Sequence, residues 1–148
     1  MSIENNARDA TMVGRRTDGT AFRRPLSPHL QVYDMFQITS GMSIAHRITG
    51  SAWAVGLLFL VWWLVAAASG PNAFATAQWF FSSFIGILVL FGLSAVAWYH
   101  TLAGVRHLMW DAGYGYDIPT VQKTGRIVLI ATGVMTVLTW FIAIIAWA

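Results

Sequence analysis

Two long windows without formal charge constrain the fold of this chain more than any other feature of its sequence. Residues 48–105 and 127–148 contain no Asp, Glu, Lys or Arg, although the 148 residues include nine Lys and Arg and six Asp and Glu. A transmembrane helix needs about 20 consecutive apolar residues. The first window therefore has room for two crossings and the second for one, and we predict an all-α membrane protein with three transmembrane helices.

The turn between the first two helices is also visible in the sequence. Residues 70–72 read Gly-Pro-Asn, a strong turn signal inside the first uncharged window. The second helix is longer than the hydrocarbon core requires, so we expect it to tilt or to project beyond the bilayer near Arg106. The predicted spans are residues 44–69, 79–108 and 124–147.

The N-terminal part of the chain differs from the rest in composition. Residues 1–22 are polar and show little apolar periodicity, and we expect them to become ordered only when a partner docks on them. We accordingly divide the chain into a cytoplasmic N-terminal tail with an interfacial segment, residues 1–43, and a three-helix transmembrane anchor domain, residues 44–148.

The basic residues predict how the helices are oriented. Every Lys and Arg lies either before residue 48 or between residues 106 and 126, and none lies in the 69–78 loop. The positive-inside rule then places the N-terminus in the cytoplasm and the C-terminus outside, which suits a multi-pass protein of a bacterial inner membrane. The apolar run from residue 44 is too late and too long for a cleaved signal peptide. The net charge of +3 is modest and gives no reason to expect a nucleic-acid partner.

An ionisable side chain lies deep inside the second predicted span. His100 belongs to segment 78–105, which has no charged residue, and such a position is by default a functional-site hypothesis. His107 falls on nearly the same helical face two turns later, beside Arg106, where the charges resume. Gly104, one turn beyond His100, would let a flat macrocycle approach the helix. The alternatives are an interhelical hydrogen bond for His100 and a simple interfacial position for His107.

A second polar group stands at the cytoplasmic start of the first span. Ser43 and Arg47 are four residues apart and share a helical face, and His46 lies about 60° away from it. A hydroxyl, a guanidinium and an imidazole at the bilayer edge would suit an oxygen acceptor on an apolar body, such as a quinone carbonyl or a haem propionate. The alternative for Arg47 is an anchor that extends to lipid phosphate.

The absence of cysteine removes several kinds of site. This sequence can form no disulfide, no cysteine-ligated iron–sulfur cluster and no thioether-attached haem. Any redox centre must be held non-covalently by His or Met, and the chain has four His. We find no nucleotide-binding loop, zinc-protease helix or hydrolase elbow.

Three segments carry a resemblance to a known family. They read SPHLQVY at residues 27–33, SIAHRITG at 43–50 and YHTLAGVRHLMWDAG at 99–113. With these segments in this order on a three-helix chain, residues 24–148 strongly resemble the cytochrome b556 subunits of succinate dehydrogenase, the larger membrane anchors of respiratory complex II.

The resemblance implies roles for individual residues. His100 corresponds to an axial ligand of haem b, whose other ligand is a histidine of a second membrane anchor subunit, so the fold would be half of a heterodimeric anchor bundle. Ser43 and Arg47 correspond to ubiquinone-site residues, and His46, Arg47 and His107 to positions around the haem propionates. Arg106, next to His107 in sequence, is expected to add a positive charge near the haem propionates.

The implied reaction is spread over several subunits. Succinate would be oxidised on a flavoprotein subunit, electrons would pass through an iron–sulfur subunit, and this anchor would help place ubiquinone without being catalytic itself. A quinol-oxidising fumarate reductase anchor would share this architecture. A small transporter or channel subunit with His100 as a proton relay is an alternative of another class, but the spans lack the intramembrane acids and broken-helix signals typical of transporters.

Overall fold

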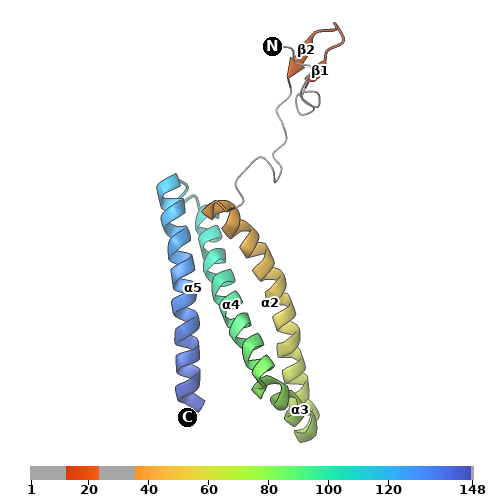
Figure 1. Ribbon diagram of the computed structural model, residues 1–148, viewed down its shortest axis with the longest axis vertical. Helices are drawn as coiled ribbons and strands as arrows, with labels where there is room; N and C mark the ends of the chain where they lie inside the picture. The colour runs from red at the N-terminus through yellow and green to blue at the C-terminus, as the bar shows by residue number, and fades with distance from the viewer. Residues whose placement is uncertain (1–12, 24–35, 148) are drawn as a thin grey trace. The chain divides into compact units, whose positions relative to one another are not determined.

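The structure is a computed structural model that describes residues 13–23 and 36–147, with side chains described to residue 146 (Figure 1). The chain divides into two units, Met1–Met35 and Phe36–Ala148. The SPHLQVY segment, with His29, lies outside the described residues.

The first unit contains a short β-hairpin. Strand β1 (Val13–Arg15) pairs antiparallel with β2 (Ala21–Arg23), and the turn between them closes through hydrogen bonds from Gly19 N to Arg16 O and from Arg16 N to Thr20 O, both 2.9 Å. Gly19 has a φ of +84°, as in the common three-residue hairpin loop. Our sequence analysis indicated no regular structure here. The Asp-Gly pair in the turn was the signal that it missed.

The second unit is helical, and three of its helices are long and apolar enough to cross a membrane, which confirms the predicted number of spans. The mean hydropathy of these three helices is 2.0, 1.7 and 2.4 in chain order. Most of their large apolar side chains are exposed on the chain by itself. A surface of this kind is suited to lipid or to other membrane helices. The helices are α2 (Ile38–Ser69), α3 (Pro71–Ser82), α4 (Phe84–Asp111) and α5 (Ile118–Trp147).

The second span differs from the prediction in where it begins. We predicted one helix over residues 79–108, whereas the structure ends α3 at Ser82 and starts α4 at Phe84. Ser83 has extended backbone, accepts a hydrogen bond from Gly86 N at 3.1 Å and caps α4. A Cβ on Gly86 would lie 2.1 Å from Phe80 O. The break therefore depends on a close backbone approach that hydropathy does not report.

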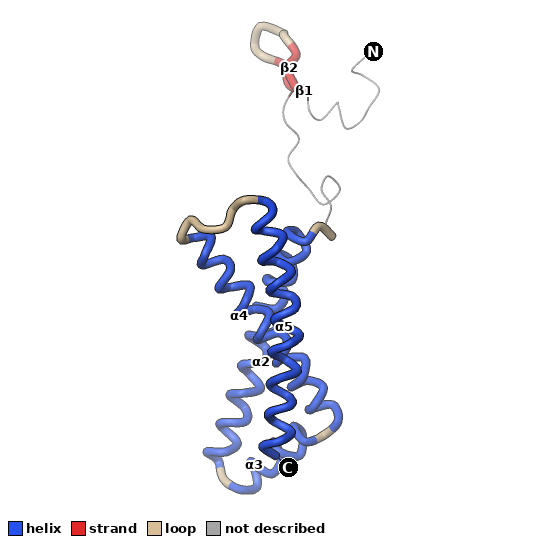
Figure 2. The backbone as a smooth tube through the Cα atoms, turned by 90° about the vertical axis from the view of Figure 1, so that its left-hand side faces the viewer, coloured by secondary structure: helices blue, strands red, loops and turns tan. Residues whose placement is uncertain are grey.

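All the charged side chains of the described helical unit lie toward one of its ends. That end holds the start of α2 and the loop between α4 and α5, while α3 and the C-terminal end of α5 lie at the opposite end (Figures 1 and 2). Helix α2 begins six residues before the predicted span, so the motif at residues 43–50 lies within it. These charged side chains are Arg47, Arg106, Asp111, Asp117, Lys123 and Arg126.

Helix α4 packs against both α2 and α5. The small core at the charged end contains Met42, Tyr99, Ala103 and Val128. The Tyr99 hydroxyl donates to the Met42 carbonyl at 2.9 Å and so ties α4 to α2. Gly125 lets α5 come close to α2, because a Cβ there would lie 2.9 Å from the Met42 sulfur. This packing fixes the position of the neighbouring residue, His100.

Candidate functional site

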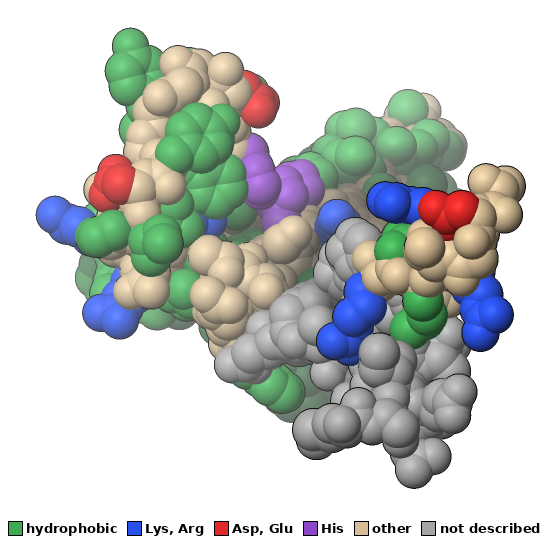
Figure 3. All heavy atoms as spheres, turned by 90° about the horizontal axis from the view of Figure 1, so that it is seen from above, with side chains coloured by type: hydrophobic (Ala, Val, Ile, Leu, Met, Phe, Trp, Pro, Cys, Tyr) green, Lys and Arg blue, Asp and Glu red, His purple; other side chains and the backbone are tan. Residues whose placement is uncertain are grey.

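Three imidazoles meet between α2 and α4. The rings of His46 and His100 stack with centroids 4.1 Å apart and planes inclined by 5°, and the rings of His46 and His107 lie 5.1 Å apart at 38°. Figure 3 looks onto the charged end, where the purple histidines form one patch beside hydrophobic side chains. We call His46, His100 and His107 the imidazole cluster.

The cluster forms because two sequence signals from different helices converge. His100 and His107 share one face of α4, as their spacing predicted, and α2 brings His46 between them. The Nδ1 atom of His46 is buried and has no hydrogen-bond partner among the residues that the structure describes. A buried polar atom without a partner is costly, so this nitrogen is available to a group that the chain itself does not supply.

Thr49 contacts the ring of His100 from α2. Its Oγ1 lies 3.3 Å from His100 Nδ1, 2.8 Å from the carbonyl oxygen of Ala45 and 3.0 Å from that of His46. Sequence analysis missed this threonine, although it lies inside the motif at residues 43–50. Nothing in its spacing indicated a partner 51 residues later in the chain.

Two glycines border the cluster, at different distances. A Cβ on Gly50 would lie 3.1 Å from His100 Cε1, whereas a Cβ on Gly104 would lie 3.9 Å from His46 Cε1. The first distance is tighter than ordinary contact and the second is not. The expected approach of a flat macrocycle at Gly104 stays a prediction, and within this chain the tighter approach is at Gly50.

Arg106 lies beside the cluster in sequence but is directed toward α5. Its side chain is 7% exposed, its Nε donates to Thr124 Oγ1 at 3.0 Å, and its Nη2 donates to Val121 O at 2.7 Å. The guanidinium also lies over the Trp110 ring, 4.1 Å from its centroid. These contacts join α4 to α5 at the charged end, so two of the five N–H donors of Arg106 are used within the chain.

Ser43 and Arg47 lie one turn apart on α2, at the same end as the imidazole cluster. Ser43 is half-buried and Arg47 is exposed. The spacing places both side chains on one helical face, as the sequence predicted. An exposed guanidinium beside a half-buried hydroxyl can donate to a ligand at the edge of the membrane.

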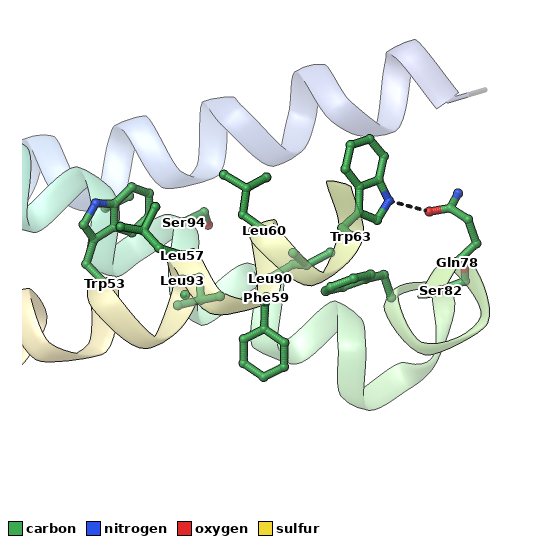
Figure 4. A pocket seen from close by; sticks show the side chains of 13 residues that line it. Trp53, Leu57, Phe59, Leu60, Trp63, Gln78, Ser82, Leu90, Leu93 and Ser94 are labelled. Atoms are coloured by element: carbon green, nitrogen blue, oxygen red, sulfur yellow. Dashed lines mark hydrogen bonds between the residues drawn. The ribbon is translucent and has the colours of Figure 1, made fainter. Parts of the chain in front are cut away.

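A groove near the opposite end of the helical unit has a different character. A groove of about 470 Å³ lies among α2, α3 and α4 near the opposite end, and its main polar feature is the hydrogen bond from Trp63 Nε1 to Gln78 Oε1 at 3.0 Å (Figure 4). Its other lining residues are mostly Leu, Phe and Trp. No titratable side chain lines this groove, so the chemistry of this chain concentrates at the imidazole cluster.

Comparison with known proteins extends over most of the chain. Residues 20–141 match the family described as succinate dehydrogenase/fumarate reductase transmembrane subunit. The chain is 47% identical over 116 residues to the succinate dehydrogenase cytochrome b556 subunit of Paracoccus denitrificans, covering 78% of this chain and 88% of the relative. The cytochrome b556 subunit of Rickettsia typhi is 42% identical over 120 residues, covering 80% and 91%.

A cytochrome b560 subunit is also similar to this chain. The succinate dehydrogenase cytochrome b560 subunit of Reclinomonas americana is 40% identical over 126 residues, covering 80% of this chain and 85% of the relative. The matched residues include the motifs at residues 43–50 and 99–113 on which the resemblance was based. The chain belongs to the family of succinate dehydrogenase and fumarate reductase transmembrane subunits.

Proposed function

We propose that this family member anchors a succinate dehydrogenase complex in a bacterial inner membrane, shares haem b with a second anchor subunit and helps to form the site of ubiquinone reduction. The imidazole cluster carries the proposal, because it leaves Nε2 of His100 without a hydrogen-bond partner among the described residues, next to a second imidazole, that of His46. The names of the relatives favour succinate oxidation over fumarate reduction.

The residues of the cluster fit a haem. Nδ1 of His100 faces Thr49, while no described residue forms a hydrogen bond with its Nε2, and haem iron is commonly held by an imidazole nitrogen. His46 would not bind the same iron as His100, because their stacked rings, 4.1 Å apart, leave no room for a macrocycle between them. The second ligand then comes from the other anchor subunit. When bound, the haem would supply one-electron transfer.

The charged end suits the haem carboxylates. The buried Nδ1 of His46 lacks a partner within the described part of the chain, and His107 lies 5.1 Å from its ring. Arg47 adds a cation from α2, and a guanidinium binds carboxylates strongly. Arg106 contributes positive charge at the same end, while its hydrogen bonds hold α5 in place.

Ser43 and Arg47 would bind the quinone headgroup. Both are hydrogen-bond donors at the edge of the bilayer, and a quinone presents carbonyl oxygens on an apolar ring. The chain itself would remain non-catalytic, since its residues bind and orient while the flavoprotein and iron–sulfur subunits oxidise succinate and carry electrons. The basic end faces the cytoplasm, with the N-terminus inside and the C-terminus in the periplasm.

The haem assignment is tested by replacing the ligand. In the co-expressed complex, His100→Ala should remove the b-type band from the reduced-minus-oxidised spectrum, because the iron loses a ligand that no neighbouring side chain replaces. His107→Ala, on the same helical face, should keep the band, because His107 is assigned to the haem carboxylates and not to the iron. A band that survives in His100→Ala but disappears in His107→Ala would reassign the ligand to His107.

The quinone assignment is tested by separating two activities. Arg47→Leu should reduce succinate–ubiquinone turnover by an order of magnitude or more, because the headgroup loses a charge-assisted hydrogen bond of roughly 1.5–3 kcal/mol. Succinate oxidation by an artificial acceptor that bypasses the quinone should stay near wild type. Equal loss of both activities would indicate failed assembly and would count against a specific role in quinone binding.

A further inference from the structure

We propose that Thr49 is a positioning residue for His100: its hydroxyl oxygen accepts a hydrogen bond from Nδ1–H, which fixes the ring tautomer and directs Nε2 to the haem iron. The inference rests on the proposed haem ligation by His100. It assigns a role to a residue on α2, while the ligand lies on α4.

The other hydrogen bonds of the Thr49 hydroxyl indicate that His100 Nδ1 is the donor and Thr49 Oγ1 the acceptor. Thr49 has one hydroxyl proton, and two backbone carbonyls on α2, those of Ala45 and His46, lie 2.8 and 3.0 Å from Oγ1. Those carbonyls can only accept, so the proton is directed to them. The remaining lone pairs of Oγ1 face His100 Nδ1 at 3.3 Å. The nitrogen must then be the donor, so in the neutral imidazole that a haem ligand has to be, Nε2 would be the unprotonated nitrogen.

Two further contacts hold the ring in one orientation. Gly50, next to Thr49, allows the backbone of α2 to approach, since a Cβ there would lie 3.1 Å from His100 Cε1. The His46 ring stacks in parallel at 4.1 Å. The imidazole is thus bounded by His46 and by the Thr49–Gly50 turn of α2. Metal-binding histidines usually donate their second ring nitrogen to an acceptor of this kind, which raises the basicity of the ligand.

The inference predicts a change in the redox potential of the haem. A more basic imidazole stabilises ferric relative to ferrous iron, because it donates more electron density to the metal. Removing the acceptor should therefore raise the midpoint potential. It should also broaden the ferric electron paramagnetic resonance signal, because the ring would no longer have one preferred orientation.

The test uses the complete complex with all its subunits. Thr49→Val removes the hydroxyl at nearly constant volume, and Thr49→Ser retains it. Thr132→Val is the matched control, since Thr132 makes the same backbone hydrogen bond within α5, to Val128 O at 2.8 Å, with no imidazole beside it. We expect a higher midpoint potential and a broadened signal only in Thr49→Val, with Thr49→Ser and Thr132→Val close to wild type.

The remaining outcomes either refute or support the positioning role of Thr49. A wild-type potential and signal in Thr49→Val, or an equal shift in Thr49→Ser, would overturn the positioning role. If Thr49→Val and Thr49→Ala assemble without haem while Thr49→Ser is loaded, the requirement for the hydroxyl is supported. If His100→Ala keeps its haem, the proposed ligand itself is wrong. A wild-type Thr49→Val beside a haem-free His100→Ala would refute only the role of Thr49.

Discussion

The orientation of His100 depends on the absence of a side chain at Gly50. In Gly50→Ala the new methyl would lie 3.1 Å from His100 Cε1, so the ring would have to shift by a few tenths of an ångström. We expect reduced haem content and a shifted b-type band in the assembled complex, measured by difference spectroscopy. Gly133→Ala is the control, because no described atom lies within 4 Å of its Cβ position. Unchanged haem content in Gly50→Ala would contradict the close approach.

The guanidinium of Arg106 joins two helices through neutral acceptors. Arg106→Lys keeps the charge but cannot reproduce the hydrogen bonds to Thr124 Oγ1 and Val121 O. Hydrogen bonds to charged groups contribute about 1.5–3 kcal/mol, so the purified complex should unfold at a lower temperature. Arg126→Lys changes an exposed arginine of α5 in the same way and should be neutral. Equal melting temperatures for the two variants would show that the α4–α5 contact is not stabilising.

At the scale of the elements, the junction between α3 and α4 tolerates little change. In Gly86→Ala the added Cβ would lie 2.1 Å from Phe80 O and 2.7 Å from Phe81 Cα, and backbone atoms cannot move aside cheaply. We expect a strong loss of assembled complex on a native gel. Gly92→Ala, at a position with no described atom within 4 Å, should assemble normally. Normal assembly of Gly86→Ala would mean that the break at Ser83 is not required.

The start of α5 carries a pH-sensitive cap. Hydrogen bonds from the side chain and backbone of Thr120 lower the pKa of Asp117 below its usual value of 3.8. The stabilisation from the ionised cap is complete above that value and is lost as the pH falls through the lowered pKa. Hydrogen-exchange protection of the Thr120 and Val121 amides should therefore decrease below about pH 4. Asp117→Asn keeps an acceptor without titrating, so its protection should stay flat. The same pH dependence of hydrogen-exchange protection in the wild type and in Asp117→Asn would contradict a cap that depends on the ionised Asp117.

At the scale of the whole molecule, the described spans expose mostly apolar side chains and one polar stripe, the imidazole cluster with Arg47. Large apolar side chains are exposed along all three, and the proposed haem would take its second ligand from another subunit. Charged groups at the centre of a bilayer cost about 2.5–3.5 kcal/mol each, so this polar stripe should face a subunit bundle. Expressed alone, the chain should be degraded or free of haem, and it should accumulate with haem only when the second anchor is co-expressed.

Immunoblots and haem-stained gels of membranes from the two expression strains would measure this dependence. Co-expression of the second anchor with its deep histidine replaced by alanine is the control, and it should restore the protein without restoring normal haem. A monodisperse, haem-loaded preparation of the single chain would refute the shared ligand.

The sequence by itself determined the three spans, because apolar length and the absence of charge are properties of a continuous stretch of chain. It also placed His100 and His107 on one face, since the helical period relates residues seven apart. The family resemblance rested on two motifs that lie within α2 and α4. The residue-by-residue roles in haem and quinone binding that it implied remain predictions.

Only the tertiary structure decided how these motifs meet. The stacking of His46 on His100, the Thr49 hydroxyl on Nδ1, and the direction of Arg106 toward α5 all join helices that are distant in sequence. The break at Ser83 depends on the backbone of α3 lying against Gly86. Periodicity reports the face on which a side chain lies, but its partner depends on which helices pack together and at what depth, and hydropathy carries no record of that contact.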